Sequence, residues 1–154
     1  MSVMRREDDA SMTPVEGEGR RVMLVALTPE ARAALGAAQV EISQLPYRVG
    51  RESRGPRRAV ARVIMERRQS ASRPNNDLYL LEPDEPLNVS REHFQIEHNG
   101  THWVLVDRQS TCGTIVEGQV IGGNHAGGAA PLRDGDVIIV GTSSSRFVFK
   151  FRVA

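Results

Sequence analysis

Short runs of β-forming residues dominate the chain after residue 75, and this pattern restricts the fold more than any other feature. The runs are rich in Val, Ile, Thr and aromatic residues, and they recur about every 8–12 residues between Gly, Pro, Asn and Asp. No helical pattern is long enough to cover a parallel sheet. The sequence therefore predicts an all-β fold, an antiparallel β-sandwich or barrel. We expect strands at 78–80, 93–97, 103–107, 114–116, 137–140 and 146–151.

The first half of the chain predicts further strands and one short helix. An apolar run of strand length occupies 22–27. Thr28 is a suitable N-cap for a helix with Pro29 at its first position and Gly36 just past its end. Strands are expected again at 40–42 and 47–51.

Asn99-Gly100 lies between two of the expected strands and predicts a β-hairpin there. A type I′ turn has positive φ at both central residues, which Asn and Gly tolerate best. We therefore expect residues 93–97 and 103–107 to pair through a type I′ turn.

Charge is unevenly distributed along the chain. Residues 1–20 contain five acidic residues and little apolar pattern, which predicts a disordered acidic tail before a domain at 21–154. Residues 54–73 contain seven Arg and one Glu, a local charge of +6, although the whole chain carries only +1. In this Arg-rich insert we expect a strand rather than a short helix, because Val and Ile cluster after Pro56. Its charge indicates where an anionic partner would be attracted.

The length of the chain, its apolar segments and its cysteine content restrict where in the cell we expect the protein. The 154 residues fit one domain with a modest core. No stretch reaches the length of about 20 apolar residues that a membrane-spanning helix needs, and the first residues lack the apolar region of a secretory signal. A single cysteine, Cys112, has no partner within the chain for a disulfide. We therefore expect a cytoplasmic protein without a membrane partner.

Polar motifs occur in a characteristic order at the ends of the expected strands. Gly50-Arg51 comes first, followed by Ser90-x-x-His93. The segment from Asp107 to Thr114 reads D-x-x-S-x-C-G-T, and Glu117-Gly118 and an L-x-x-G-D-x-I-x-V-G ending at 132–141 follow it. This succession resembles the forkhead-associated (FHA) domain family from about residue 22 to the C-terminus. The resemblance implies an FHA-type β-sandwich that binds phosphothreonine-containing segments of other proteins.

The resemblance also implies roles for individual residues. Arg51 would be the principal phosphate ligand, and Ser90 would donate its hydroxyl and its backbone N–H. Arg91 and Thr111 would complete the phosphate cradle from neighbouring loops. Such a cradle suits a phosphothreonine, because its group carries about −1.5 to −2 charges and three acceptor oxygens, and a guanidinium presents paired donors in a fixed fork.

Other positions would support the site. The resemblance implies that His93 joins two loops by hydrogen bonds, that Gly50 permits close packing, and that Gly113 gives structural support to the site. Cys112 stands where the family has an Asn that holds the main chain of the ligand, and a thiol is a weaker hydrogen-bonding group. The protein would then act as an adaptor for a Ser/Thr kinase or its substrate.

Catalysis and metal or cofactor binding have little support in the sequence. His93, Asp107, Ser110 and Cys112 are present, but no nucleophile elbow such as G-x-S-x-G accompanies them. The spacing of His93, His98 and His102 mimics a helical metal site, yet Asn99-Gly100 would break such a helix. The Gly-rich segment 122–128 lacks the Lys-Ser/Thr of a P-loop, so we expect a flexible loop there.

Three alternatives stay open at this point. The domain could be a phosphate-independent protein scaffold if Cys112 has weakened the site. The Arg-rich insert could contact nucleic acid, although it lacks aromatic residues for base stacking. Phosphorylation of Thr13, which precedes Pro14 in the acidic tail, could produce a segment that docks in the domain's own site.

Overall fold

The structure is a computed structural model that describes residues 21–52, 76–83 and 86–154. The expectations for the acidic tail at 1–20 and for a strand in the Arg-rich insert at 54–73 lie outside the described residues.

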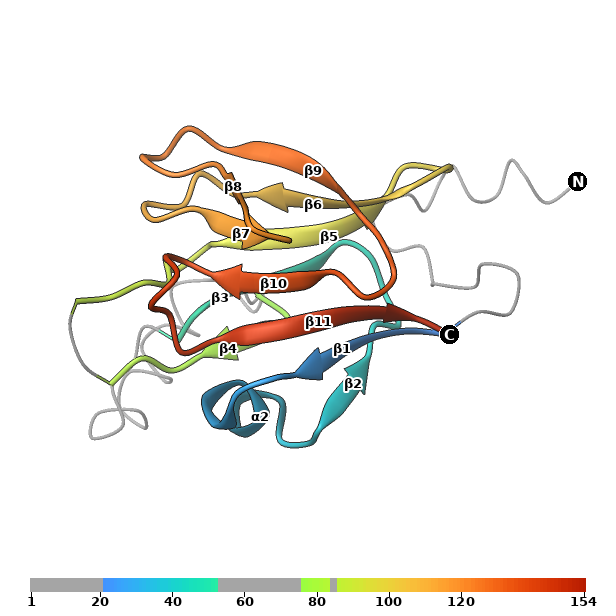
Figure 1. Cartoon of the computed structure of the whole chain (residues 1–154), viewed down its shortest axis with the longest axis horizontal. Helices are drawn as coiled ribbons and strands as arrows, with labels where there is room; N and C mark the ends of the chain where they lie inside the picture. Colours follow the sequence, from blue (N-terminus) through green and yellow to red (C-terminus); the bar gives the residue numbers. More distant parts are fainter. Residues whose placement is uncertain (1–20, 53–75, 84–85) are drawn as a thin grey trace, which may run out of the picture.

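Eleven strands in the described part of the chain form two sheets that face each other (Figure 1). The first sheet has the order β2 (Gln39–Glu41), β1 (Val22–Ala26), β11 (Val148–Val153), β10 (Val137–Val140), β7 (Thr114–Val116) and β8 (Gln119–Ile121). The second has the order β4 (Leu78–Leu80), β3 (Tyr47–Arg51), β5 (Phe94–His98), β6 (Trp103–Asp107) and β9 (Gly128–Leu132). The expected all-β sandwich is confirmed.

Three features of the sheets differ from the expectation. The pair β3–β4 is parallel, whereas the other pairs are antiparallel. Strands β8 and β9 were not expected from the sequence. Strand β9 contains Gly128 and Pro131, both poor strand formers, and pairing with β6 overrides this low propensity.

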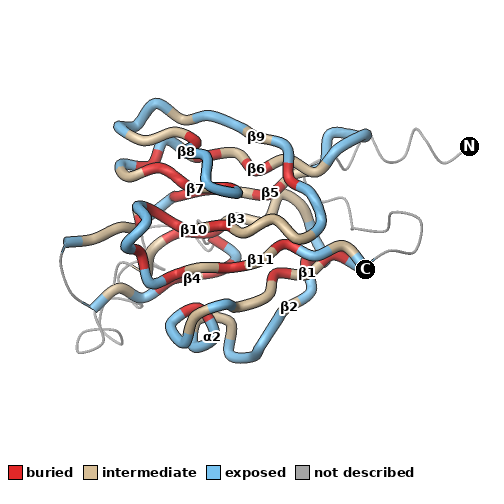
Figure 2. Tube along the Cα trace, viewed as in Figure 1, coloured by how far each residue is buried: buried red, intermediate tan, exposed pale blue. Residues whose placement is uncertain are grey.

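The core lies between the sheets, where alternate residues of each strand are buried (Figure 2). On β11, Phe149 and Phe151 are fully buried while their strand neighbours are not, as the period of two in a strand requires. The Trp103 ring of β6 lies 5.7 Å, centroid to centroid, from the ring of Phe151 and so joins the two sheets. Burial of a large aromatic side chain contributes roughly 1.5–3 kcal/mol.

The expected helix is confirmed as α2 (Pro29–Leu35). Thr28 caps it by accepting a hydrogen bond from the backbone N–H of Ala31 at 3.2 Å, and Gly36 ends it with φ of 73°. The helix contacts β1 of one sheet and β4 of the other, so it covers the space between their edges. Among the described residues, no helix has the length and apolar character needed to cross a membrane.

The turn predictions were partly wrong. The hairpin of β5 and β6 is present, but four residues, 99–102, connect the two strands and Asn99 does not have positive φ. Its side chain instead accepts hydrogen bonds from the backbone N–H groups of Thr101 and His102. A two-residue turn with positive φ at both positions occurs at Glu117 (48°) and Gly118 (81°), between β7 and β8.

Strand register brings the loops with the polar motifs to one end of the sandwich. Val49 pairs with Phe94, Phe94 with Asp107, and Asp107 with Gly128, so β3 and β6 end where β5 and β9 begin. The opposite end holds both ends of the described domain, where Arg21 and Ala154 exchange backbone hydrogen bonds of 3.2 and 2.8 Å.

Candidate functional site

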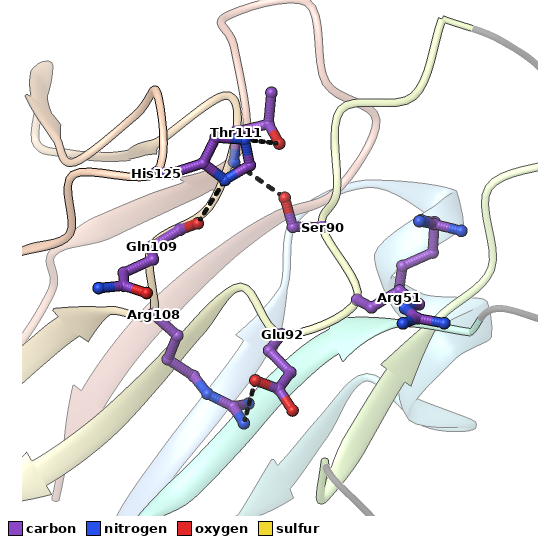
Figure 3. Close-up of a pocket in the computed structure, with 8 residues that line it drawn as sticks. Arg51, Ser90, Glu92, Arg108, Gln109, Thr111 and His125 are labelled. Carbon is purple, nitrogen blue, oxygen red and sulfur yellow. Dashed lines mark hydrogen bonds and ion pairs between the residues drawn. The ribbon is translucent and has the colours of Figure 1, made fainter.

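A hollow of about 490 Å³ opens among the loops at the end of the sandwich that carries the motifs (Figure 3). Four residues that the sequence singled out line it, namely Arg51, Ser90, Arg91 and Thr111. Four further residues line it that the sequence did not single out as ligands, namely Glu92, Arg108, Gln109 and His125. Four segments distant in the sequence therefore meet at one surface.

Arg51 is the last residue of β3, and two hydrogen bonds hold it against the loop between β4 and β5. Its backbone N–H donates to the carbonyl oxygen of Ser90 at 2.9 Å, and its Nε donates to that of Val89 at 2.8 Å. The two terminal nitrogens of the guanidinium make no hydrogen bond or ion pair with the other described residues. The guanidinium is thus fixed through its Nε, and the N–H groups of its two terminal nitrogens are available to an anion.

Gly50 allows this loop to approach β3 closely. A Cβ atom at position 50 would lie 2.0 Å from the carbonyl oxygen of Arg91 and 2.7 Å from Nδ2 of Asn76. Because no side chain fits in that space, glycine is what permits the turn after Ser90 to pack directly on the strand.

His93 is fully buried and connects two of the loops. Its Nδ1 accepts a hydrogen bond from the backbone N–H of Ser90 at 2.9 Å, so its Nε2 carries the proton that is donated to the carbonyl oxygen of Gly113 at 2.7 Å. Burial lowers the pKa of His93, although the bond to Gly113 and the nearby carboxylates of Asp107 and Glu82 oppose that shift. The neutral ring is therefore the form that this geometry needs.

The contact of Ser90 with His93 corrects one expectation. The backbone N–H of Ser90, expected to bind phosphate, is directed to the His93 ring instead. The hydroxyl oxygen of Ser90 accepts a hydrogen bond from the backbone N–H of Thr111 at 2.9 Å. This contact leaves the hydroxyl hydrogen of Ser90 as the group that the residue presents to a ligand.

The loop between β6 and β7 is held by the buried carboxylate of Asp107. Its Oδ1 accepts from the backbone N–H of Ser110, and its Oδ2 accepts from the hydroxyls of Ser110 and Thr114, all at 2.8–2.9 Å. The Ser110 hydroxyl oxygen in turn accepts from the backbone N–H of Gly113 at 2.9 Å. This network fixes the conformation in which Thr111 reaches the hollow.

Cys112 does not line the hollow. Its half-buried thiol lies 3.8 Å from the carbonyl oxygen of Leu87, in the segment that precedes Ser90. Gly113, the next residue, has φ of 83°, a conformation that favours glycine, and its carbonyl oxygen receives the His93 hydrogen bond.

Two residues that the sequence reasoning missed support the turn after Ser90. Asn76 is buried, and its side chain donates to the carbonyl oxygen of Arg91 at 2.8 Å and accepts from Nη1 of Arg108 at 2.7 Å. Arg108 also forms an ion pair with the exposed carboxylate of Glu92 at 3.7 Å. Nothing in the sequence indicates these contacts, since they join segments about 15 to 32 residues apart.

The Gly-rich segment, expected to be a flexible loop, is also part of the site. The backbone N–H of Asn124 donates to the carbonyl oxygen of Thr111 at 2.8 Å, and that of His125 donates to the carbonyl oxygen of Ser110 at 2.9 Å. His125 lines the hollow. The segment is thus hydrogen-bonded to the loop that carries Thr111, and its last glycine, Gly128, already belongs to β9.

The charged groups around the hollow are mostly cationic. Three guanidinium groups and one carboxylate line it, a net charge of +2 with His125 neutral. Such a lining attracts anions. Within the described residues, no three His, Cys, Asp or Glu side chains are grouped in a way that could hold a metal ion.

Comparison with known proteins gives one family and several similar folds. The family model of the FHA domain matches residues 47–141, more than half of the chain. No curated protein sequence matches the chain.

Solved structures of other FHA domains share the fold. The kinase-interacting FHA domain of the Arabidopsis kinase associated protein phosphatase has 24% identity and a TM-score of 0.56, with 88% of this chain and 94% of that chain covered. The FHA domain of Chlamydia trachomatis CT664 has 21% identity and a TM-score of 0.51, with 86% and 96% covered. Mycobacterium tuberculosis EmbR, in complex with a low affinity phosphopeptide, has 22% identity and a TM-score of 0.55. The match covers 99% of this chain but only 29% of the EmbR chain.

Proposed function

Because the chain belongs to the FHA domain family, we propose that it binds phosphothreonine-containing segments of other proteins in the hollow lined by Arg51, Ser90, Arg91 and Thr111. FHA domains recognise phosphorylated motifs through clusters of arginine. The observation that carries the proposal is that two guanidinium groups and two hydroxyls, from three separate segments, line one hollow.

The charge and the donors of the hollow suit a phosphate group. A phosphothreonine brings about −1.5 to −2 charges and three strong acceptor oxygens, and the net charge of the lining is +2. The outer nitrogens of Arg51 and the hydroxyl of Ser90 supply donors for those oxygens. Each charge-assisted hydrogen bond contributes roughly 1.5–3 kcal/mol, so three or four of them, less the ordering costs, fit a micromolar complex of about −8 kcal/mol.

The polar residues that could suggest catalysis have structural contacts instead. The hydroxyl of Ser110 is bonded to Asp107 and Gly113 rather than to a histidine, and both ring nitrogens of His93 bond to the backbone. A nucleophile needs a neighbouring base to be activated. These contacts favour a binding module over an enzyme.

We place the domain as an adaptor in Ser/Thr kinase signalling. Two solved structures with a similar fold support this proposal, because one is named as a kinase-interacting FHA domain and the other was solved with a phosphopeptide bound. The partner would be a protein phosphorylated on threonine, either a kinase or one of its substrates.

Fluorescence polarisation with a degenerate phosphothreonine peptide library tests the proposal. We expect micromolar binding by the wild type, none by the unphosphorylated library, and a loss of tenfold or more in affinity for Arg51→Ala, since a charged hydrogen-bond donor is removed.

The matched control is Arg133→Ala, because Arg133 is an exposed arginine that follows β9 at the opposite end of the sandwich. Its affinity should equal that of the wild type. Equal binding by wild type and Arg51→Ala would refute the site, and equal binding of both libraries would favour a phosphate-independent scaffold.

A further inference from the structure

The guanidinium of Arg51 has a single side-chain anchor within the described residues. Its Nε donates a hydrogen bond to the carbonyl oxygen of Val89 at 2.8 Å, and its two terminal nitrogens have no partner in that part of the chain. The direction in which the terminal N–H groups face the hollow therefore depends on where the Val89 carbonyl lies. Recognition by such paired donors is sensitive to displacements of about 0.5 Å.

The carbonyl of Val89 belongs to a peptide plane that is held on both sides. Because the peptide group is planar, the carbonyl of Val89 and the N–H of Ser90 point in opposite directions. The N–H donates to Nδ1 of His93 at 2.9 Å, and the carbonyl accepts from Arg51. Val89 is buried, so protein groups and not water hold this plane in place.

The carboxylate of Glu82 holds the backbone immediately before that plane. Glu82 lies two residues after the end of β4, and its Oε1 accepts from the backbone N–H groups of Asn88 and Val89, both at 2.9 Å. Its Oε2 also accepts from the N–H of Asn88 at 2.9 Å. Hydrogen bonds to an ionised acceptor are stronger than those between neutral groups. One carboxylate thus fixes the residue whose carbonyl receives the Arg51 hydrogen bond.

Asn88 has a second anchor that does not involve Glu82. Its side-chain Oδ1 accepts from the hydroxyl of Thr142, in the turn between β10 and β11, at 2.6 Å. Gly141 lets that turn approach closely, since a Cβ there would lie 2.7 Å from the Cβ of Asn88. Removal of the Glu82 carboxylate would therefore release the N–H of Val89 while Asn88 stays attached to the turn.

We propose that Glu82 is a positioning residue for Arg51. Its carboxylate holds the backbone of Val89 so that the Val89 carbonyl orients the guanidinium toward the hollow before a ligand binds. The inference rests on the proposed function and gives a role in it to a residue that does not line the hollow. A side chain ordered in advance loses less conformational freedom on binding, which corresponds to about two- to tenfold in affinity.

The test is a double-mutant cycle on phosphothreonine-peptide affinity, with Glu82→Ala and Arg51→Lys as the single changes. Lysine keeps the positive charge but has a carbon atom, Cε, where arginine has Nε, so it presents no N–H to Val89 at that position. We expect Glu82→Ala to weaken binding about two- to tenfold when Arg51 is present. In the Arg51→Lys background its effect should be less than about twofold. An equal loss in both backgrounds would show that Glu82 acts on the fold in general and would overturn the inference.

A conservative variant separates the geometry of the contact from its charge. Glu82→Gln keeps an acceptor oxygen for both N–H groups and removes the negative charge. We expect its affinity to equal or exceed that of the wild type, because loss of a carboxylate removes only repulsion toward a phosphate. A loss as large as that of Glu82→Ala would overturn the positioning role. The matched control is Glu41→Ala, which removes an exposed glutamate paired with Arg21 at the remote end of the sandwich and should bind as the wild type does.

The free protein offers a readout that needs no ligand. In a nitrogen–proton correlation NMR spectrum, the Nε–H signal of Arg51 is identified by its absence from the spectrum of Arg51→Lys. We expect hydrogen exchange of this group with water to be several times faster in Glu82→Ala than in the wild type, Glu82→Gln and Glu41→Ala. An unchanged exchange rate would overturn the inference, even if Arg51→Lys binds too weakly to complete the cycle.

The outcomes distinguish this inference from the proposed function. A loss of affinity confined to proteins that contain Arg51, together with faster exchange in Glu82→Ala, would support the role of Glu82. Equal phosphopeptide binding by the wild type and Glu82→Ala would overturn that role and leave the proposed function intact. No phosphopeptide binding by the wild type would overturn the proposed function and this inference with it.

Discussion

The carbonyl oxygen of Arg91 occupies the space that the Cβ of any other residue than Gly50 would need, at a distance of 2.0 Å. For this reason the strand that ends in Arg51 and the turn that begins at Ser90 cannot both keep their positions if residue 50 has a side chain. A single methyl group at position 50 should therefore displace the strand end or the turn that carries the proposed phosphate ligands.

We expect Gly50→Ala to lower the free energy of unfolding by about 1–3 kcal/mol, the usual cost of overpacking, and to weaken phosphopeptide binding. Urea unfolding and fluorescence polarisation measure the two effects. Gly36→Ala is the control, since a Cβ there meets no atom within 4 Å and only the strain of positive φ remains, about 1–2 kcal/mol. A peptide affinity of Gly50→Ala as high as that of the wild type would contradict the expectation.

The buried His93 predicts a loss of stability in mild acid. Its folded-state pKa is lowered by burial, whereas an unfolded histidine has a pKa of about 6.5. Below that pH the unfolded state binds a proton that the native state does not. Stability that is present above pH 6.5 is therefore lost as the pH falls, by up to about 1.4 kcal/mol per pH unit.

Urea unfolding at pH 7.5 and 5.5 measures this effect against His93→Gln, which does not titrate. The stability difference between the two proteins should shrink at the lower pH. His98→Gln, which alters an exposed histidine, should keep the wild-type slope. A constant difference between wild type and His93→Gln would show that His93 does not cause the acid sensitivity.

The buried hydroxyl of Ser110 predicts a stability effect in the loop of Thr111. Ser110→Ala removes the hydroxyl that donates a hydrogen bond to the Asp107 carboxylate and accepts one from the backbone N–H of Gly113. Unsatisfied buried groups of this kind cost roughly 1–3 kcal/mol each. We expect denaturant unfolding to show a loss in that range, and Ser143→Ala, at an exposed serine, to show none. An unchanged midpoint for Ser110→Ala would contradict this role.

Cys112 predicts a gain of function by substitution. If the ligand main chain passes this position, Cys112→Asn should restore the amide of the family and raise phosphopeptide affinity about tenfold, or roughly 1.4 kcal/mol, within the range of such hydrogen bonds. Cys112→Ser has no amide and should show little gain. The measurement is again fluorescence polarisation, and unchanged affinity for Cys112→Asn would place the ligand elsewhere.

The sandwich could be predicted because short runs of β-forming residues recur at regular intervals along the chain. The positions of the polar motifs between these runs also predicted which loops carry them. The sequence did not predict β9, since Gly128 and Pro131 disfavour strands and only pairing with β6 makes one. It also misplaced the type I′ turn at Asn99. There the amide side chain bonds to the following backbone instead.

Several residues around the hollow could not be predicted from the amino-acid sequence, because their contacts have no local pattern. Asn76 and Arg108 meet across 32 positions, and Thr111 and His125 across 14. Arg51, Ser90 and Thr111 are also far apart in the sequence, but ordered motifs mark them. A motif therefore indicates the ligand contacts, whereas the residues that position them become visible only in three dimensions.

Arg21 and Ala154 meet at the end of the sandwich remote from the hollow, and this proximity bears on how the domain works within a longer polypeptide. The chain enters and leaves the fold at neighbouring points (Figure 1). A neighbouring module or a surface tether joined at either point would hold the domain by its base. The recognition loops would then face outward, toward whatever phosphorylated chain comes within reach.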